Sequence, residues 1–145
     1  MNKLNIILTS ENTKDAVVDN LDIVLELIPE IKSMINFPHN HPHHHLDVWN
    51  HTLEVVNNLD STDLELNMAA LLHDIGKPFS YQDEEVRHFR GHPKVSFEMT
   101  KNILNRLGYD ETFIDRVSYL VRTHDEKIDP NNLDNEIDLV KKRLK

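Results

Sequence analysis

The chain has 145 residues, of which 39% are hydrophobic and 28% are charged, and this length and composition favour one compact domain. The formal net charge of -9 argues against nonspecific binding to a nucleic acid, because that binding depends on accumulated positive charge. The lack of cysteine excludes disulfides, thiolate metal sites and cysteine nucleophiles, and leaves histidine and carboxylate as the strong metal ligands. The apolar run at residues 6–8 is too short to span a bilayer or to form a signal-peptide core, so we expect a cytoplasmic protein without a membrane partner.

The first part of the chain shows apolar residues at helical spacing, which predicts an all-α fold. A first helix is expected over residues 17–28, until Pro29 interrupts the pattern. A second apolar stripe runs over residues 46–56. Thr62 and Glu65 match a capping box for a third helix over about residues 63–75. Most of that helix is apolar, so we expect it at the centre of the fold.

The second part of the chain begins with a stretch without periodicity, residues 76–91, which we expect to be a loop. Pro93 suits a first helical turn and Gly108 a C-terminal cap, so they bracket the next predicted helix. Another apolar stripe starts at Phe113 and is continued by His124. A charged amphipathic helix is expected over residues 133–144.

Four histidines fall on or beside the apolar faces of four different predicted helices. His51 lies at the edge of one stripe, His73 and Asp74 end the central helix, His92 opens the next helix, and His124 extends the last stripe. Neutral imidazole is the commonest metal ligand in proteins, and facing helices of a bundle build such sites in their core. The four imidazoles and the adjacent carboxylate therefore indicate a divalent-metal site.

Each of these residues also has a purely structural interpretation. A single inward histidine is more often a core or cap residue than a ligand. Asp74 could be a helix-end residue that pairs with Lys77. However, the apolar stretch at residues 69–72 makes unpaired burial of that carboxylate costly, so we favour a metal.

Four short motifs, in chain order, carry a family resemblance. They are "DVWNHT" around His51, "AALLHDIGKP" around His73 and Asp74, "FRGHPKVS" around His92 and "LVRTHD" around His124. Together they resemble the HD-domain superfamily of metal-dependent phosphohydrolases, in particular HD domains of the type found in tRNA nucleotidyltransferases. The resemblance covers about residues 40–125. It implies a bundle of about six to seven helices, with residues 1–145 as a single HD domain.

The resemblance also implies a set of metal ligands. His51, His73 and Asp74 would hold a divalent metal, chosen from Fe, Mn, Zn, Co, Ni or Mg. His92 and His124 match the additional histidines of members with two metals, in which Asp74 would bridge the ions. The family usually closes its first site with a late aspartate, and the expected residue here is Asp125, with these alternatives: Asp129, Asp134, Asp138, or a position beyond Lys145 in a shortened or degenerate member.

Several cations are expected to contact a phosphorylated substrate. A metal-bound hydroxide is the expected nucleophile, with Asp74 and Lys77 as the catalytic residues. Lys77 would neutralise a phosphate as a point charge, and Arg90 and Arg122 would do so with planar guanidinium groups. Each of the three could instead be a solvated surface cation.

Six of the ten histidines lie within residues 37–52. The run is internal and leads into a helical pattern, so it is not a purification tag. We expect it to bring His44 and His45 to the mouth of the pocket, for substrate contact or proton transfer. Three others are interpreted as solvated loop residues: His39, His41 and His43.

Two functions are consistent with these motifs. The first is a metal-dependent phosphohydrolase, a phosphomonoesterase or phosphodiesterase that acts on a nucleotide or related small phosphate ester. The alternative is a catalytically silent HD domain that binds a metal or nucleotide as a sensor or partner module. Both imply a small phosphorylated ligand, and the oligomeric state is open.

Overall fold

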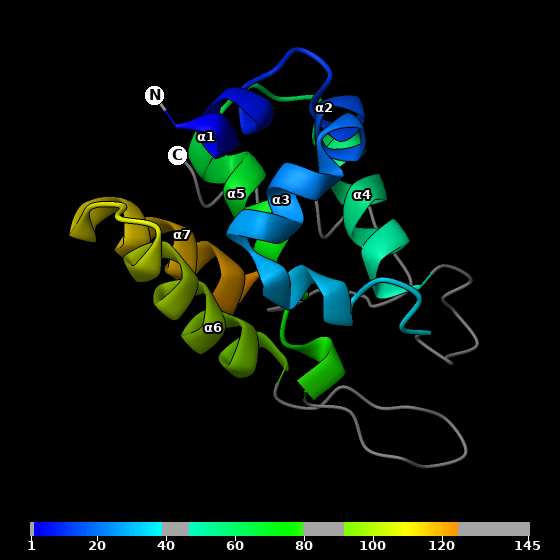
Figure 1. Cartoon of the computed structure of the whole chain (residues 1–145). Helices are drawn as coiled ribbons and strands as arrows, with labels where there is room; N and C mark the ends of the chain where they lie inside the picture. The colour runs from blue at the N-terminus through cyan, green and yellow to red at the C-terminus, as the bar shows by residue number, and fades with distance from the viewer. Residues whose placement is uncertain (1, 39–46, 80–91, 125–145) are drawn as a thin grey trace.

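A computed structural model of the protein describes residues 2–38, 47–79 and 92–124, apart from the side chains of His92 and Pro93. Over these ranges the chain forms seven α-helices and two 3-10 helices, which confirms the all-α prediction and the expected number of helices (Figure 1). In chain order they are α1 (Lys3–Leu8), α2 (Thr13–Asp19), α3 (Leu21–Leu27), η1 (Pro29–Ser33), α4 (Val48–Leu59), α5 (Leu64–Leu72), η2 (Lys77–Phe79), α6 (His92–Arg106) and α7 (Glu111–Thr123).

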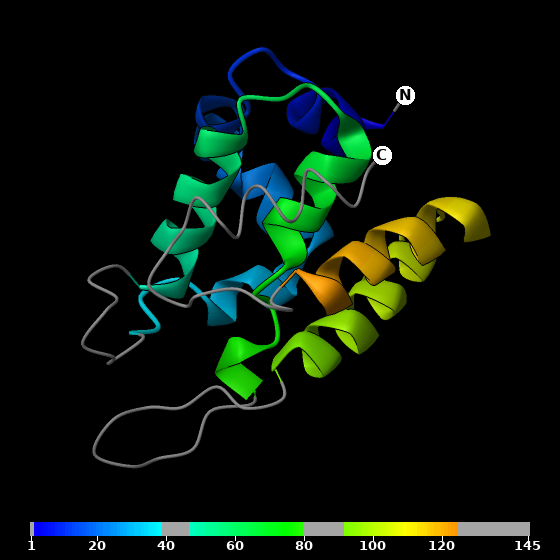
Figure 2. The ribbon, with the colours of Figure 1, turned by 180° about the vertical axis from the view of Figure 1, so that it is seen from behind.

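Helix α5 lies at the centre of the described fold, as its apolar sequence predicted. It packs against α4, α7 and α1, while α6 and α7 form a hairpin along one side (Figures 1 and 2). Every residue from Leu66 to Leu72 is buried, including Asn67, whose side-chain amide donates to the carbonyls of Leu8 and Ser61. The first hydrogen bond joins the N-terminal helix α1 to the central helix, and the second joins the α4–α5 connection to it.

The helix predicted over residues 17–28 is two helices, α2 and α3, which meet at Asn20. The side-chain amide of Asn20 donates to the carbonyl of Ala16 at 2.8 Å, so it competes locally with the backbone of a continuing helix. Val17 and Val24 are nevertheless both fully buried. The apolar spacing was therefore read correctly as a buried face, but the prediction of one uninterrupted helix was wrong.

Aspartate side chains begin three of the helices. Asp47 caps α4, Asp63 caps α5 and Asp110 caps α7, each by accepting from a backbone N–H three residues later. The predicted capping box at Thr62 is therefore wrong, because the adjacent Asp63 takes its place. Glu65, its expected partner, accepts instead from the guanidinium of Arg116 at 2.7 Å.

Proline and glycine mark helix boundaries where the sequence predicted them. Pro29 begins η1, and Gly108 follows α6 with φ +86°, a left-handed conformation that favours glycine. The loop expected over residues 76–91 is described as far as Phe79, and Lys77–Phe79 form η2 there. Its residues 80–91 and the helix expected over 133–144 lie outside the described residues. Among the described helices, none combines the length and hydropathy needed to cross a membrane.

Candidate metal centre

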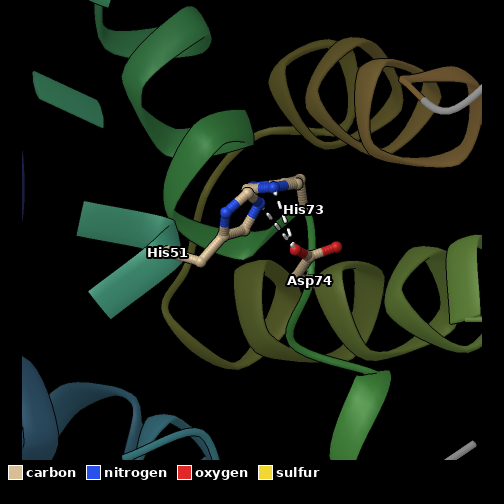
Figure 3. Close-up of side chains that lie close together, drawn as sticks. All are labelled: His51, His73 and Asp74. Carbon is tan, nitrogen blue, oxygen red and sulfur yellow. Dashed lines mark ion pairs between the residues drawn. The ribbon is translucent and has the colours of Figure 1, made fainter. Parts of the chain in front are cut away.

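Three residues that the sequence singled out meet where α4 faces the end of α5. His51 projects from α4, and His73 and Asp74 follow the last residue of α5 directly (Figure 3). All three are buried, with His73 and Asp74 each only 1% exposed. The apolar faces that pack α4 on α5 therefore also hold these polar groups in the interior.

The Asp74 carboxylate is the centre of this cluster. Its Oδ2 atom lies 3.2 Å from Nε2 of His73 and 3.6 Å from Nε2 of His51. Both pairs are drawn as dashed lines in Figure 3. Its Oδ1 atom lies 3.8 Å from Nε2 of His124, the buried residue that ends α7. Three imidazoles from three parts of the chain thus present the same ring nitrogen to one carboxylate.

The backbone orients two of these imidazole rings. Nδ1 of His73 lies 2.6 Å from the carbonyl oxygen of Ala70, and Nδ1 of His124 lies 2.5 Å from that of Val121. A carbonyl oxygen only accepts hydrogen bonds, so the neutral form of each histidine carries its ring proton on Nδ1. The lone pair of Nε2 then points towards Asp74, which is the arrangement found in metal-ligating histidines.

The donor set fits a divalent transition metal. Ligand atoms of His51, His73 and Asp74 all lie within 4.8 Å of one another, close enough for one ion to reach them. Two imidazole nitrogens and a carboxylate oxygen suit Zn, Mn, Fe, Co or Ni, whereas Mg²⁺ prefers oxygen ligands. The described residues therefore contain a group that can hold a divalent metal, as the sequence predicted.

Gly76 allows this cluster to pack tightly against α6. A Cβ atom at this position would lie 2.6 Å from the backbone nitrogen of Ser96 and 2.8 Å from its hydroxyl. The N–H of Gly76 donates to that hydroxyl at 2.8 Å. The sequence pattern assigned no role to Ser96, because a hydroxyl that accepts one backbone N–H has no distinctive spacing.

Lys77 is buried beside the cluster, with 7% of its surface exposed. Its Nζ atom lies 3.2 Å from Oδ2 of Asp74, so the interpretation of Lys77 as a solvated surface cation is wrong. The alternative pairing of Asp74 with Lys77 does occur, in addition to the histidine contacts. Arg122, by contrast, is exposed, and its guanidinium lies over the ring of Phe97.

The remaining predicted site residues lie wholly or in part outside the described part of the chain. His92 begins α6, but its side chain lies outside the described part. The others lie wholly outside it: His44, His45, Arg90, Asp125, Asp129, Asp134 and Asp138.

A protein-family model described as "HD domain" matches residues 43–144. The chain belongs to the HD domain family. It is 36% identical over 108 residues to the CC-adding tRNA nucleotidyltransferase of Thermus thermophilus, covering 70% of this chain and 25% of that protein. It is 40% identical over 88 residues to the A-adding tRNA nucleotidyltransferase of Deinococcus radiodurans, covering 56% and 20%. A "Multifunctional CCA protein" of Pseudomonas fluorescens is 35% identical over 83 residues, covering 55% and 20%.

These relatives confirm the family resemblance, and the HD domain chain spans about a quarter or less of their length. They contradict three of the functional predictions. The relatives are transferases that act on tRNA, not phosphohydrolases of small phosphate esters. The predictions of a small-molecule partner and of no nucleic-acid binding are therefore wrong. The alternative function, a silent sensor of metal or nucleotide, did not include RNA as a ligand either. The prediction about nucleic acid was wrong because net charge describes the whole chain and not one local surface. The hydrolase prediction was wrong because a set of metal-binding side chains does not by itself fix the reaction.

Proposed function

We propose that this chain is a divalent-metal-binding HD domain that engages tRNA within the chemistry of nucleotide addition. The convergence of three imidazole Nε2 atoms on the Asp74 carboxylate supports the metal-binding part of the proposal. The tRNA part is supported by the relatives, which are named for adding nucleotides to tRNA. A tRNA ligand is consistent with the expected cytoplasmic location. We also propose that residues 1–145 form one HD domain, which the contacts of α1 with α5 support.

The proposed role of the metal centre is to bind a phosphate of the tRNA. Its donor set of two imidazoles and one carboxylate differs from the oxygen-rich sets that hold Mg²⁺ with a nucleotide triphosphate. A bound transition metal would supply a Lewis acid for a phosphoryl oxygen. His51 and His73 would ligate it through nitrogen and Asp74 through oxygen. Lys77, whose ammonium group is buried beside Asp74, would add a fixed positive charge next to that phosphate.

A second ion is part of the proposal because Asp74 uses its two oxygens differently. Oδ2 faces His51 and His73, whereas Oδ1 faces His124. A carboxylate in this position can bridge two cations, with imidazole nitrogen on each side. We therefore propose up to two divalent ions, the second held by Asp74 and His124.

The test combines metal analysis with tRNA binding. Purified wild-type protein, loaded with Zn²⁺ or Mn²⁺ and then desalted, should retain at least one equivalent of metal by elemental analysis. It should bind a tRNA transcript more tightly than the same protein treated with a chelator. Asp74→Ala should lose the metal, whereas the matched control Asp115→Ala, an exposed aspartate on α7, should retain it.

Two results would count against the proposal at separate points. A wild-type protein that retains no metal at any concentration tested would contradict the metal centre. A metal-loaded wild-type protein that does not bind tRNA would contradict the tRNA role while leaving the metal centre intact.

A further inference from the structure

The α6–α7 hairpin carries two cations over one aromatic ring. Nζ of Lys101 lies 5.2 Å from the centroid of the Phe97 ring, and the guanidinium carbon of Arg122 lies 5.3 Å from it. Both distances are within the range of cation–π attraction. Phe97 and Lys101 are partly exposed and Arg122 is exposed, so this group faces solvent. The ring thus holds two positive charges together on the surface of an acidic chain.

Two further exposed residues extend this group along the two helices. Lys94 lies three residues before Phe97 on α6, and Tyr119 lies three residues before Arg122 on α7 and is 52% exposed. Residues three apart in a helix share a face. Cations and aromatic rings therefore alternate on both helices.

The charge of this region is positive although the whole chain is acidic. Three cations belong to it, beside two exposed acidic residues: Glu98 on α6, and Asp115, which lies four residues before Tyr119 on α7. Arg116, the other cation of α7, is engaged by Glu65 on α5 and lies outside the group. The local sign is therefore complementary to phosphate.

One end of this region adjoins the metal centre through both helices. On α7, Arg122 precedes the buried His124 by two residues. On α6, Phe97 follows Ser96, whose hydroxyl accepts from the N–H of Gly76 at 2.8 Å. Figures 1 and 2 both show α6 and α7 side by side along this side of the fold. The solvent-facing region and the buried cluster are therefore carried by the same two helices.

We infer that this region, the α6–α7 surface (Lys94, Phe97, Lys101, Tyr119 and Arg122), binds the single-stranded end of an RNA. The inference rests on the proposed tRNA function and names the surface that performs it. The cations would contact phosphates, Arg122 through two N–H groups, and the aromatic rings would stack on bases. Cations combined with exposed aromatic rings are typical of single-stranded nucleic-acid sites, and stacking on them tolerates any base sequence.

The experiment measures the affinity of the full-length, metal-loaded protein for a fluorescein-labelled tRNA transcript by anisotropy at several salt concentrations. Lys101→Gln and Arg122→Gln should each weaken binding about fivefold at roughly 0.1 M salt, and each should lower the slope of log affinity against log salt by about 0.7–0.9. Phe97→Leu should weaken binding while leaving that slope nearly unchanged, because it removes stacking and not charge. Metal content should stay at the wild-type level in all three variants.

Arg116→Gln is the matched control, since it removes one exposed positive charge from the same helix outside the surface. It should bind tRNA like the wild type. An equal loss of affinity in Arg116→Gln and Arg122→Gln would reveal a general charge effect and overturn the α6–α7 surface. Wild-type affinity in both Lys101→Gln and Arg122→Gln would also overturn it while leaving the proposed tRNA function standing.

A failure of the proposed function would look different. If the wild-type protein does not bind tRNA, a single-stranded RNA oligonucleotide replaces the transcript as the probe. Binding of that oligonucleotide with the same loss in Arg122→Gln would support the surface without tRNA. No binding of either RNA by the wild-type protein would overturn both.

Discussion

Replacing Gly76 by alanine should damage both the stability of the fold and the metal centre. The new Cβ atom would lie 2.6 Å from the backbone nitrogen of Ser96 and 2.9 Å from Cβ of Val95, closer than real Cβ atoms are found. The nearest atom belongs to the backbone of α6, so no side-chain rotation relieves the contact. The segment that carries Asp74 or the start of α6 must move instead.

The expected cost follows from this overpacking. Forcing one extra carbon into a packed interior typically costs about 1–3 kcal/mol. For a chain of 145 residues this corresponds to a fall in the unfolding temperature of roughly 3–10 °C. Because Gly76 follows Asp74 by two residues, we also expect weaker metal binding. Differential scanning calorimetry of the metal-free protein and titration with Zn²⁺ measure the two effects separately.

Gly108→Ala is the matched control, because it adds the same atom without a collision. A Cβ atom at Gly108 meets nothing within 4 Å, but the φ of +86° is strained for alanine. We expect a loss of about 1 kcal/mol from this strain, with unchanged metal affinity. The reasoning is refuted if Gly76→Ala unfolds at the wild-type temperature and binds metal normally. It is also refuted if adding Ser96→Ala restores both properties, since the hydroxyl and not the backbone would then be the obstacle.

Two further predictions concern stability alone. The hydrogen bond from Arg106 holds the pKa of Glu30 below its ordinary 4.5, so this ion pair stabilises the fold above that pH and the contribution is lost as the pH falls through the lowered value. At pH 7, urea unfolding should therefore give Glu30→Gln a free energy of unfolding lower than that of the wild type by less than about 1 kcal/mol, since the pair is partly exposed. In strong acid the two proteins should be equally stable. A difference that is the same at every pH would contradict the pairing. Asp47→Ala should cost about 1–2 kcal/mol, because Asp47 accepts from Asn50 at the start of α4 and from the N–H of Asn36. Asp47→Asn should recover part of that loss, and equal losses in the two variants would contradict the capping role.

The buried helices and the clustering of the candidate metal ligands were predictable from sequence for the same physical reason. Apolar spacing reports which face of a helix is buried, and His51 and His73 could be placed relative to that face. Asp74 follows a fully apolar stretch, so its burial and its need for partners could also be predicted. The structure brings these residues together as expected.

Other features depended on local competition that spacing does not record. The break at Asn20 leaves the apolar period intact, so the pattern alone could not separate α2 from α3. Asp63 and Thr62 are neighbouring residues that both suit a cap, and the choice is made by the geometry of the first turn. The argument against nucleic acid had another weakness, because the net charge of -9 describes the whole chain and does not report local groups such as the two cations beside Phe97.

The orientation of His73 and His124 by carbonyl oxygens affects how this site tolerates mutation. Many metal sites use a carboxylate side chain to orient a ligating histidine, and a single substitution can remove that partner. Here the acceptors belong to the main chain of Ala70 and Val121, and every amino acid supplies a carbonyl oxygen. Point substitution at either position cannot delete the acceptor, provided that the helical turn persists. The ring orientation therefore depends on the helical backbone and not on a particular neighbouring side chain. Sequences that differ around these histidines can retain it.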